Sequence, residues 1–293
     1  MNPFPETADI ETSSDDYATR FAGPAGEWFL KCQSDIVLDW MKATPGASVL
    51  DVGGGHGQLA LPLARAGHKV TVLGSDESCR RRIDAEVARG DIAFTVGNVI
   101  QLPYPDRHFD VVVSIRLLPH CDRWPELVAE LCRVARRAVI VDYPASRSLN
   151  VFSDALFAMK KKVEKNTRPY RLFTRAEIDA EFARARFAEG ARQPEFFWPM
   201  VLHRMLDRPA LSTLLESLPR AFGLTHLLGS PVLARYDKPS AWPNNLLEPD
   251  SSAGNRPSPG ARSSYPSWRV HKARHTRPAA PMEGQGTCTE ETS

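Results

Sequence analysis

The sequence predicts an α/β fold built on a mostly parallel sheet, and two patterns support this prediction. Between residues 47 and 143, short apolar runs alternate with stretches of helical spacing. The apolar runs are rich in β-branched residues, as buried parallel strands are, and the helical stretches supply the crossovers of βαβ units. The second pattern is a glycine-rich turn directly after the first apolar run, where the backbone is free to turn sharply and to approach a ligand closely.

The predicted elements follow one another in a regular order. The expected strands read SVLDV, KVTVLG, AFTVGN, DVVVSI and AVIVDY, and the helices between them read LALPLARAG, ESCRRRIDAEVARG and PELVAELCRVAR. Further along the chain, TRAEIDAEFARARF has helical spacing and PVLARY resembles a strand. Two stretches, about 145–173 and 201–228, interrupt this order, and we expect them to be lid insertions with helical character.

Composition places the chain among ordinary globular proteins. Hydrophobic residues make up 42% of its 293 residues and charged residues 25%. No run of about 18 apolar residues is present, and the polar, acidic N-terminus is unlike a secretory signal, so we expect a cytoplasmic location. The five cysteines are an odd number without a CxxC pair, which favours reduced thiols over disulfides or a zinc site. A net charge of +2 gives no indication of nucleic-acid binding.

The two ends of the chain differ from its middle. Residues 1–16 are polar, and we expect a flexible N-terminus there. Residues 17–238 form the expected domain, which begins with a helical cap at 17–45, where apolar residues recur at helical spacing. Residues 239–293 contain eight of the 24 prolines and few aliphatic residues, so this tail is predicted to be disordered.

The most informative segment runs from Val49 to Gly57 and reads VLDVGGGHG. A buried strand leads there into an acidic residue and a DxGxGxG turn. The dinucleotide-binding pattern GxGxxG is not met, because Gln58 stands where the third glycine belongs. This segment resembles the first motif of class I S-adenosylmethionine-dependent methyltransferases. The resemblance extends from about Gly46 to Tyr143, where HCDRWPELVAELCRVAR is similar to a helix of the small-molecule branch that includes quinone-biosynthesis enzymes.

The resemblance implies a Rossmann-like fold with a seven-stranded sheet, S-adenosylmethionine as the cofactor and a small-molecule acceptor. Gly53, Gly55 and Gly57 would contact the methionine and ribose side of the cofactor, with Asp51 near its ammonium group. It implies neither a metal nor a membrane span, and it leaves the oligomeric state open.

At two positions the chain departs from the family pattern. Asn98, followed by Val99, stands where the family has an aspartate at the adenine, and the amide oxygen of Asn98 is still able to accept a hydrogen bond. Gly74 falls where the family has an acidic residue that holds the ribose hydroxyls. Asp76, Ser75 or Glu77 would have to take over that role; alternatively, Asp76 only caps the helix that follows.

Candidate residues for the chemistry follow the fourth predicted strand, at the edge of the sheet where α/β domains bind ligands. His120 is the candidate general base, or else a packing residue. Arg116 is predicted to hold the cofactor carboxylate or a substrate anion, with a salt bridge at the sheet edge as the alternative. His56 is expected to line the pocket.

The acceptor is predicted to be a small molecule. The Asn/Asp-Pro-Pro-Tyr sequence of amino-methylating DNA enzymes is absent, so a nucleic-acid base is disfavoured. The basic run MKKKVEKNTRPYR at 159–171 is either a solvated helix face or a cradle for an anionic, partly apolar molecule, and the aromatic residues 196–198 either line the site or belong to the core. Two other functions remain open, namely a catalytically idle cofactor-binding subunit and an NAD(P)-dependent oxidoreductase.

Overall fold

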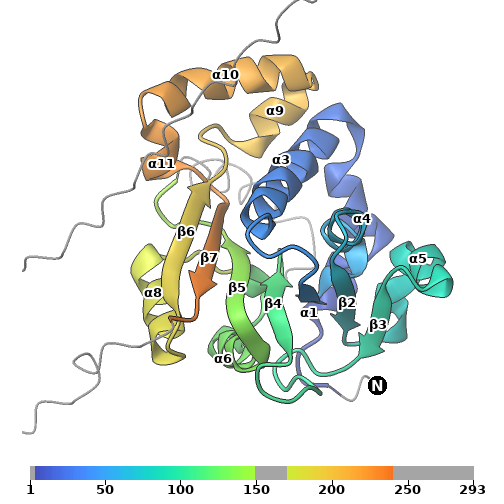
Figure 1. Cartoon of the computed structure of the whole chain (residues 1–293). Helices are drawn as coiled ribbons and strands as arrows, with labels where there is room; N and C mark the ends of the chain where they lie inside the picture. The colour runs from blue at the N-terminus through green and yellow to red at the C-terminus, as the bar shows by residue number, and fades with distance from the viewer. Residues whose placement is uncertain (1–3, 149–169, 240–293) are drawn as a thin grey trace, which may run out of the picture. The chain divides into compact units, whose positions relative to one another are not determined.

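The computed structural model describes residues 4–148 and 170–239, and these residues fold around a seven-stranded sheet (Figure 1). Its order is β3-β2-β1-β4-β5-β7-β6; β1 to β5 are parallel, and β7 runs antiparallel between β5 and β6. The strands are β1 (Ser48–Val52), β2 (Lys69–Gly74), β3 (Ala93–Val96), β4 (Phe109–Ser114), β5 (Ala135–Tyr143), β6 (Ala188–Pro194) and β7 (Val232–Asp237). The predicted α/β class and mostly parallel sheet are confirmed.

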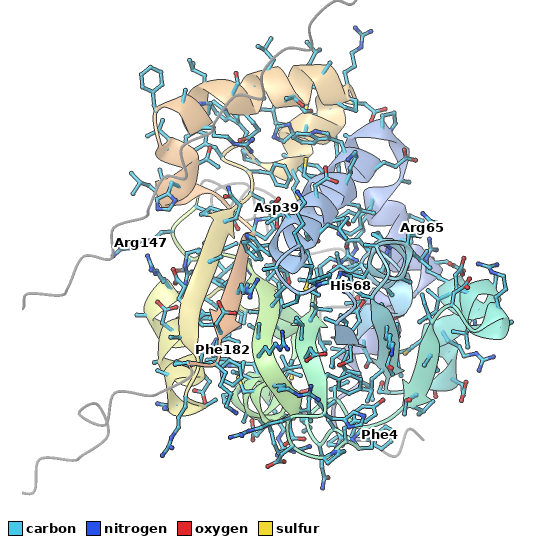
Figure 2. The ribbon with its side chains drawn as sticks, viewed as in Figure 1. Phe4, Asp39, Arg65, His68, Arg147 and Phe182 are labelled. Carbon is cyan, nitrogen blue, oxygen red and sulfur yellow. The ribbon has the colours of Figure 1, made fainter. Side chains whose placement is uncertain are left out.

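Helices cover both faces of the sheet. The helices connected with the sheet are α3 (Gly23–Met41), α4 (Ala60–Arg65), α5 (Asp84–Arg89), α6 (Trp124–Val134) and α8 (Arg175–Arg184). The 3-10 turn η3 (Glu77–Ile83) comes before α5, and η4 (Leu118–His120) comes before α6. Two buried apolar clusters separate the layers, since α3 and α4 contribute to one and α6 and α8 to the other. On the second face, Phe182 of α8, labelled in Figure 2, stacks on Tyr236 of β7 with ring centroids 3.8 Å apart.

The central parallel strands β1 and β4 are buried on both faces, and this explains their nearly unbroken apolar sequence. In β1, Leu50 and Val52 belong to the cluster under α6, while Val49 belongs to the cluster under α3. All three side chains are fully buried. Burying such a side chain stabilises a protein by roughly 1.5–3 kcal/mol. The side chains that alternate between the two faces therefore hold the sheet between its two layers of helices.

The N-terminal segment differs from our expectation of a flexible stretch over residues 1–16. It forms α1 (Ala8–Thr12), α2 (Asp15–Ala18) and the 3-10 turn η1 (Thr19–Phe21). Ala8 and Asp9 are buried, and the Asp9 carboxylate accepts hydrogen bonds from Ser75 at the end of β2. A buried polar contact of this kind fixes the segment although its composition is polar, and the expectation was therefore wrong for residues 4–16.

Between β6 and β7 lie three helices, in the segment where we expected the second lid insertion. They are α9 (Met200–Leu206), α10 (Pro209–Ala221) and α11 (Leu224–Leu228), and both α9 and α10 contact α3 (Figure 1). Most of the first expected insertion, with the basic run at 159–169, lies outside the described residues, as does the predicted tail from residue 240. Among the helices that the structure describes, none is long and apolar enough to cross a membrane.

Candidate functional site

The glycine-rich turn begins where β1 ends, at the carboxyl edge of the sheet. Gly53 and Gly57 have φ angles of 76° and 78°, in the left-handed region that glycine adopts without strain. Between them, the 3-10 turn η2 (Gly54–His56) folds back over β1. A Cβ atom on Gly54 would lie 2.1 Å from Cγ of Asp51, so the carboxyl group of Asp51 packs directly against this glycine.

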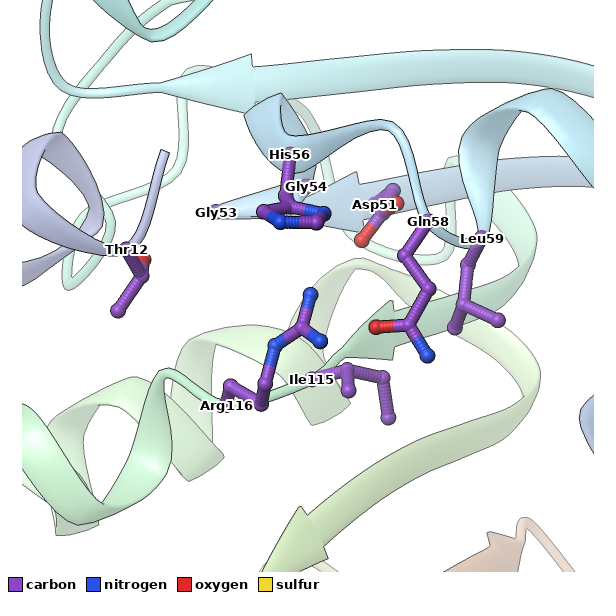
Figure 3. A pocket seen from close by; sticks show the side chains of 9 residues that line it. All are labelled: Thr12, Asp51, Gly53, Gly54, His56, Gln58, Leu59, Ile115 and Arg116. Atoms are coloured by element: carbon purple, nitrogen blue, oxygen red, sulfur yellow. The ribbon is translucent and has the colours of Figure 1, made fainter. Parts of the chain in front are cut away.

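A pocket lies at this turn, between the ends of β1 and β4 (Figure 3). Of the predicted cofactor residues, Asp51, Gly53 and Arg116 line it, together with His56 as expected. The complete lining is Thr12, Asp51, Gly53, Gly54, His56, Gln58, Leu59, Ile115 and Arg116. The structure therefore brings these predicted residues together at one pocket, with Thr12 from the N-terminal segment as a further lining residue that the sequence analysis did not name; their role in cofactor binding stays a prediction.

Arg116 reaches into the pocket from the end of β4. Its backbone has a φ of 63°, and its N–H donates to Oδ1 of Asp142 over 2.6 Å. The guanidinium carbon lies 4.8 Å from the ring centroid of Phe21. Nε and Nη1 are shielded from solvent, and neither finds a hydrogen-bond partner among the residues that the structure describes. Because a buried donor without a partner is costly, these two atoms indicate a place for an anionic or polar ligand group.

The charged groups of the pocket affect one another. Burial raises the pKa of Asp51 to about 7, although the positive charge of Arg116 acts in the opposite direction. Burial, with the nearby charges of Arg116 and Arg82, lowers the pKa of His56 to about 3. His56 is therefore a neutral imidazole at physiological pH, and both of its ring nitrogens lack a partner within the described part of the chain.

A buried network of amides and carboxyls supports the pocket from below. Nε2 of Gln58 donates to Oε1 of Gln33 over 2.7 Å, and Nε2 of Gln33 lies 3.2 Å from Asp142 and 2.9 Å from Glu195. Burial raises the pKa of Asp142, and burial together with the charge of Asp142 raises that of Glu195 well above its usual value. The Arg116 charge partly offsets both shifts. This network holds Gln58 in place at the wall of the pocket. Its carboxyl groups also partly balance the positive charge of Arg116, without a direct ion pair to the guanidinium.

The end of β2 carries the carboxylate that sequence reasoning could not locate. Oδ2 of Asp9 accepts a hydrogen bond from the Ser75 N–H over 2.5 Å, and Oδ1 accepts one from the Ser75 hydroxyl over 2.6 Å. The thiol of Cys79 lies 3.4 Å from Oδ2. Asp9 and Ser75 are both fully buried. The family pattern has an acidic residue at the position of Gly74. In this chain the acidic side chain beside that position is Asp9, which belongs to α1.

Asp76 takes the alternative role that the sequence left open. It is the N-cap of η3, and its Oδ1 accepts a hydrogen bond from the Ser78 N–H over 2.9 Å. Hydrogen bonding to Ser78 lowers the pKa of its carboxyl group. The structure therefore explains Asp76 through helix capping, and it places Asp9 rather than Asp76 against Ser75.

The predicted adenine contacts are engaged within the fold. Oδ1 of Asn98 accepts a hydrogen bond from the Ile100 N–H over 3.1 Å. Val99 is fully buried in the cluster under α6. The amide oxygen of Asn98, which we expected at the adenine, is thus already used in a local turn, and Val99 serves the core.

Two of the predicted glycines face protein rather than the pocket. A Cβ atom on Gly55 would lie 2.0 Å from the carbonyl oxygen of Cys79 and 2.6 Å from Oγ of Ser13. On Gly57 it would lie 2.9 Å from Ile83. These glycines allow η2 to pack closely against η3, and neither is among the residues lining the pocket.

His120, the candidate base, ends η4 and is not part of the pocket lining. Its ring packs edge-on against Tyr17, with centroids 6.4 Å apart, and lies 5.5 Å from that of Tyr170. Tyr17 also lies under the guanidinium of Arg116, at 5.9 Å. Tyr17 thus contacts both residues, and the catalytic role of His120 stays a prediction.

Comparison with known proteins agrees with this geometry. Residues 50–141 match the methyltransferase domain family, and they span β1 to β5 with the pocket at their carboxyl edge. Over these residues the chain is similar to the class I S-adenosylmethionine-dependent methyltransferases. The resemblance inferred from the DxGxGxG turn is thereby confirmed.

Two of the similar curated proteins have names that refer to quinones. The chain is 32% identical over 119 residues to 2-phytyl-1,4-naphtoquinone methyltransferase of Trichormus variabilis. The aligned segment covers 37% of this chain and 52% of the relative. It is 33% identical over 108 residues to the ubiquinone/menaquinone biosynthesis C-methyltransferase of Dinoroseobacter shibae, which covers 35% and 43% respectively. The chain thus spans about half the length of the curated relatives that it matches.

A solved structure supports the fold at lower identity. Magnesium protoporphyrin IX methyltransferase from Synechocystis PCC 6803, crystallised with S-adenosylhomocysteine, superposes with a TM-score of 0.52 at 18% identity. The match covers 74% of this chain and 86% of that one. This likeness establishes the class I methyltransferase fold and extends the similarity beyond the segment matched by the family.

Proposed function

We propose that this protein transfers the methyl group of S-adenosylmethionine to a small, partly apolar acceptor. The supporting observation is the set of unpaired polar atoms around the glycine turn, above all Nε and Nη1 of Arg116. They lie at the carboxyl edge of a parallel sheet, where α/β domains bind their ligands. The domain match and the names of the relatives favour methyl transfer over other uses of such a site.

We place the amino-acid end of the cofactor in this pocket on the basis of its charged lining residues. In our proposal, Arg116 binds the carboxylate, since a guanidinium pairs with a carboxylate through parallel hydrogen bonds. Asp51, on the same pocket wall as Gly53 and Gly54, faces the ammonium group. Both charges of the amino acid would then meet an opposite charge in a site with little access to water, where such interactions are strongest.

At the ribose end, we propose that Asp9 supplies the carboxylate that faces the hydroxyl groups. A carboxylate offers about four acceptor positions, and the contacts with Ser75 and Cys79 account for three of them. Cofactor binding would then involve the N-terminal segment directly, because Thr12 lines the pocket and Phe21 packs on Arg116.

The transfer itself requires little chemistry from the protein. The bound cofactor supplies an activated methyl group; the acceptor atom forms a bond to the methyl carbon as the methyl–sulfur bond breaks, and a proton leaves the acceptor. Alignment is therefore the main contribution of the chain. His120 is our candidate for accepting the proton, and the names of the relatives favour a reduced quinone with an apolar side chain as the acceptor class.

The first test is calorimetric titration of the full chain with S-adenosylmethionine, S-adenosylhomocysteine and NAD. We expect the first two to bind and NAD not to bind. Binding of NAD alone would support an oxidoreductase and overturn the proposal. A second assay follows release of S-adenosylhomocysteine with reduced 2-phytyl-1,4-naphthoquinone. Cofactor binding without turnover on any quinol tested would favour the idle binding subunit.

Arg116→Ala tests the proposed carboxylate contact. Removing a hydrogen bond to a charged group costs about 1.5–3 kcal/mol, so the dissociation constant for S-adenosylmethionine should rise tenfold or more. The decarboxylated analogue lacks the group in question, and its weaker affinity should be the same in the variant and the parent. Arg80→Ala removes an exposed arginine that pairs with Asp84 at the surface and serves as the control. Equal losses for both ligands would contradict the contact.

A further inference from the structure

The helix α10 is amphipathic, but its polar side faces the protein and its apolar side faces outwards. Its buried side carries Ser212, Glu216 and Pro219. Its exposed side carries Leu214, of which 68% is accessible, and Leu218, of which 64% is accessible. In a globular protein the apolar stripe of a surface helix normally faces the core.

The buried polar side has a clear structural reason. The Glu216 carboxylate accepts hydrogen bonds from the backbone N–H groups of Phe197 and Trp198, over 2.9 and 3.0 Å. It also lies 3.0 Å from Nε2 of His203 in α9. These contacts tie α10 to the loop after β6 and to α9. They leave the apolar side of the helix facing outwards, where no described residue covers it.

The exposed apolar residues form one stripe. Leu211, Leu214, Leu218 and Phe222 follow one another at intervals of three and four residues, which places them on one side of a helix. Neighbouring apolar side chains in the same insertion are also exposed, among them Met205 at 79% and Leu227 at 70%. We call these six residues the lid stripe. Exposed apolar side chains gathered on one side of a helix are a candidate interaction surface.

We propose that the lid stripe docks the protein on an anionic membrane surface. Amphipathic helices bind in the plane of such a surface through buried apolar side chains and through attraction between basic residues and acidic lipids. Over residues 200–229 the cations are Arg204, Arg208 and Arg220; all three are exposed, although Arg204 donates a hydrogen bond to the carbonyl oxygen of Arg20 and Arg220 donates one to that of Glu195. The two carboxylates of this segment are engaged within the fold, since Glu216 is buried and Asp207 accepts a hydrogen bond from the Ala25 N–H.

The size of the stripe favours a lipid surface over a second copy of the chain. A helix of 13 residues is about 20 Å long and about 10 Å wide, so one side presents roughly 200 Å². A stable protein interface buries about 800 Å² on each partner. Met205 and Leu227 enlarge the stripe without closing that difference. A lipid surface has no such requirement, because it accepts isolated apolar side chains without a matching shape.

Vesicle flotation with the full chain tests the proposal. The vesicles consist of phosphatidylcholine with 30 mol% phosphatidylglycerol, or of phosphatidylcholine alone. We expect the parent to float with the anionic vesicles, less with the neutral ones, and less as salt is added. Leu214→Glu combined with Leu218→Glu should lower the partition coefficient at least tenfold.

The matched control places the same two charges on the same helix. Thr213 and Ser217 are exposed beside the lid stripe and not within it, so Thr213→Glu combined with Ser217→Glu adds the same repulsion from acidic lipids without removing apolar side chains and should lose clearly less binding than the leucine pair. Circular dichroism establishes that all variants are folded. Equal losses in the two pairs would overturn the proposal, as would a parent that stays unbound. A dimer that forms through the lid stripe and ignores vesicles, detected by sedimentation velocity, would overturn it in favour of self-association. No methyl transfer is measured, so the outcome is independent of the proposed function.

Discussion

The adjacent strands β1 and β2 end at the same edge of the sheet, but their ends are completed in different ways. At β1, the acid and the glycines follow one another in the chain, and Asp51 packs against Gly54 three residues later. At β2, the carboxylate comes from Asp9, which lies 66 residues before its partner Ser75. One half of the candidate site is thus encoded locally, and the other half depends on how the N-terminal segment packs.

The largest effect is expected at β1, from Gly54→Ala. All three of the nearest atoms to the new Cβ belong to Asp51, so the substitution displaces this carboxyl group and little else. We expect the dissociation constant for S-adenosylmethionine to rise at least a hundredfold, or about 2.7 kcal/mol, with a near-native circular dichroism spectrum. Gly67→Ala is the control, because a Cβ on that glycine meets open space; its φ is positive, whereas Gly54 is not among the glycines with a positive φ, so the control carries the greater backbone strain. Tight binding by the Gly54 variant would remove Asp51 from the site.

Asp9→Ala tests the other half of the comparison. The buried N–H and hydroxyl of Ser75 would lose their acceptor, so the free energy of unfolding should fall by about 1–3 kcal/mol, measured by urea denaturation at pH 7. Asp76→Ala removes a neighbouring carboxylate that only caps η3, and it should cost less stability. If Asp9 also holds the ribose, only its variant weakens cofactor binding. Equal behaviour of the two variants would contradict the assignment.

The smallest expected effect is a pH dependence of binding that originates at β1. The pKa of Asp51 is raised to about 7, so the free protein loses this negative charge as the pH falls through 7. The ammonium of the cofactor remains charged over this range, since an α-amino group titrates near 7.7–8.0. Affinity should therefore fall by up to about tenfold per unit below pH 7, or about 1.4 kcal/mol. Asp51→Asn should bind weakly and without this slope. A parent whose affinity is flat between pH 5 and 7 would refute the ammonium contact.

The same comparison explains what sequence reasoning could and could not predict. Strands β1 to β5 and the turn after β1 follow from periodicity and glycine spacing, which are local properties. Arg116 stood out because a charge follows directly after an apolar strand. Asp9 was missed because its partner lies far away in the sequence, and a polar N-terminus normally indicates a flexible one. An acidic residue in the N-terminal segment, in a chain that has glycine at position 74 where the family has an acid, was the available signal.

The lid helices show a second limit. The stretch 201–228 was recognisable as an insertion, but the leucines of α10 predict a buried side by the usual rule. The structure reverses this because Glu216 binds backbone groups of the loop after β6. Hydropathy alone does not reveal which side of an amphipathic helix faces the protein when a buried carboxylate has backbone partners available.

The position of Asp9 in α1 also affects how this domain is compared and handled. The family match covers residues 50–141 only, so Asp9, Gln33 and Glu195 all lie outside it. A set of candidate binding residues taken only from the matched residues would omit the Asp9 carboxylate beside β2, and also Gln33 and Glu195 of the buried network near Arg116. A purification tag fused to the N-terminus would sit a few residues from α1, and a tag at the C-terminus is therefore the safer choice for measuring cofactor affinity.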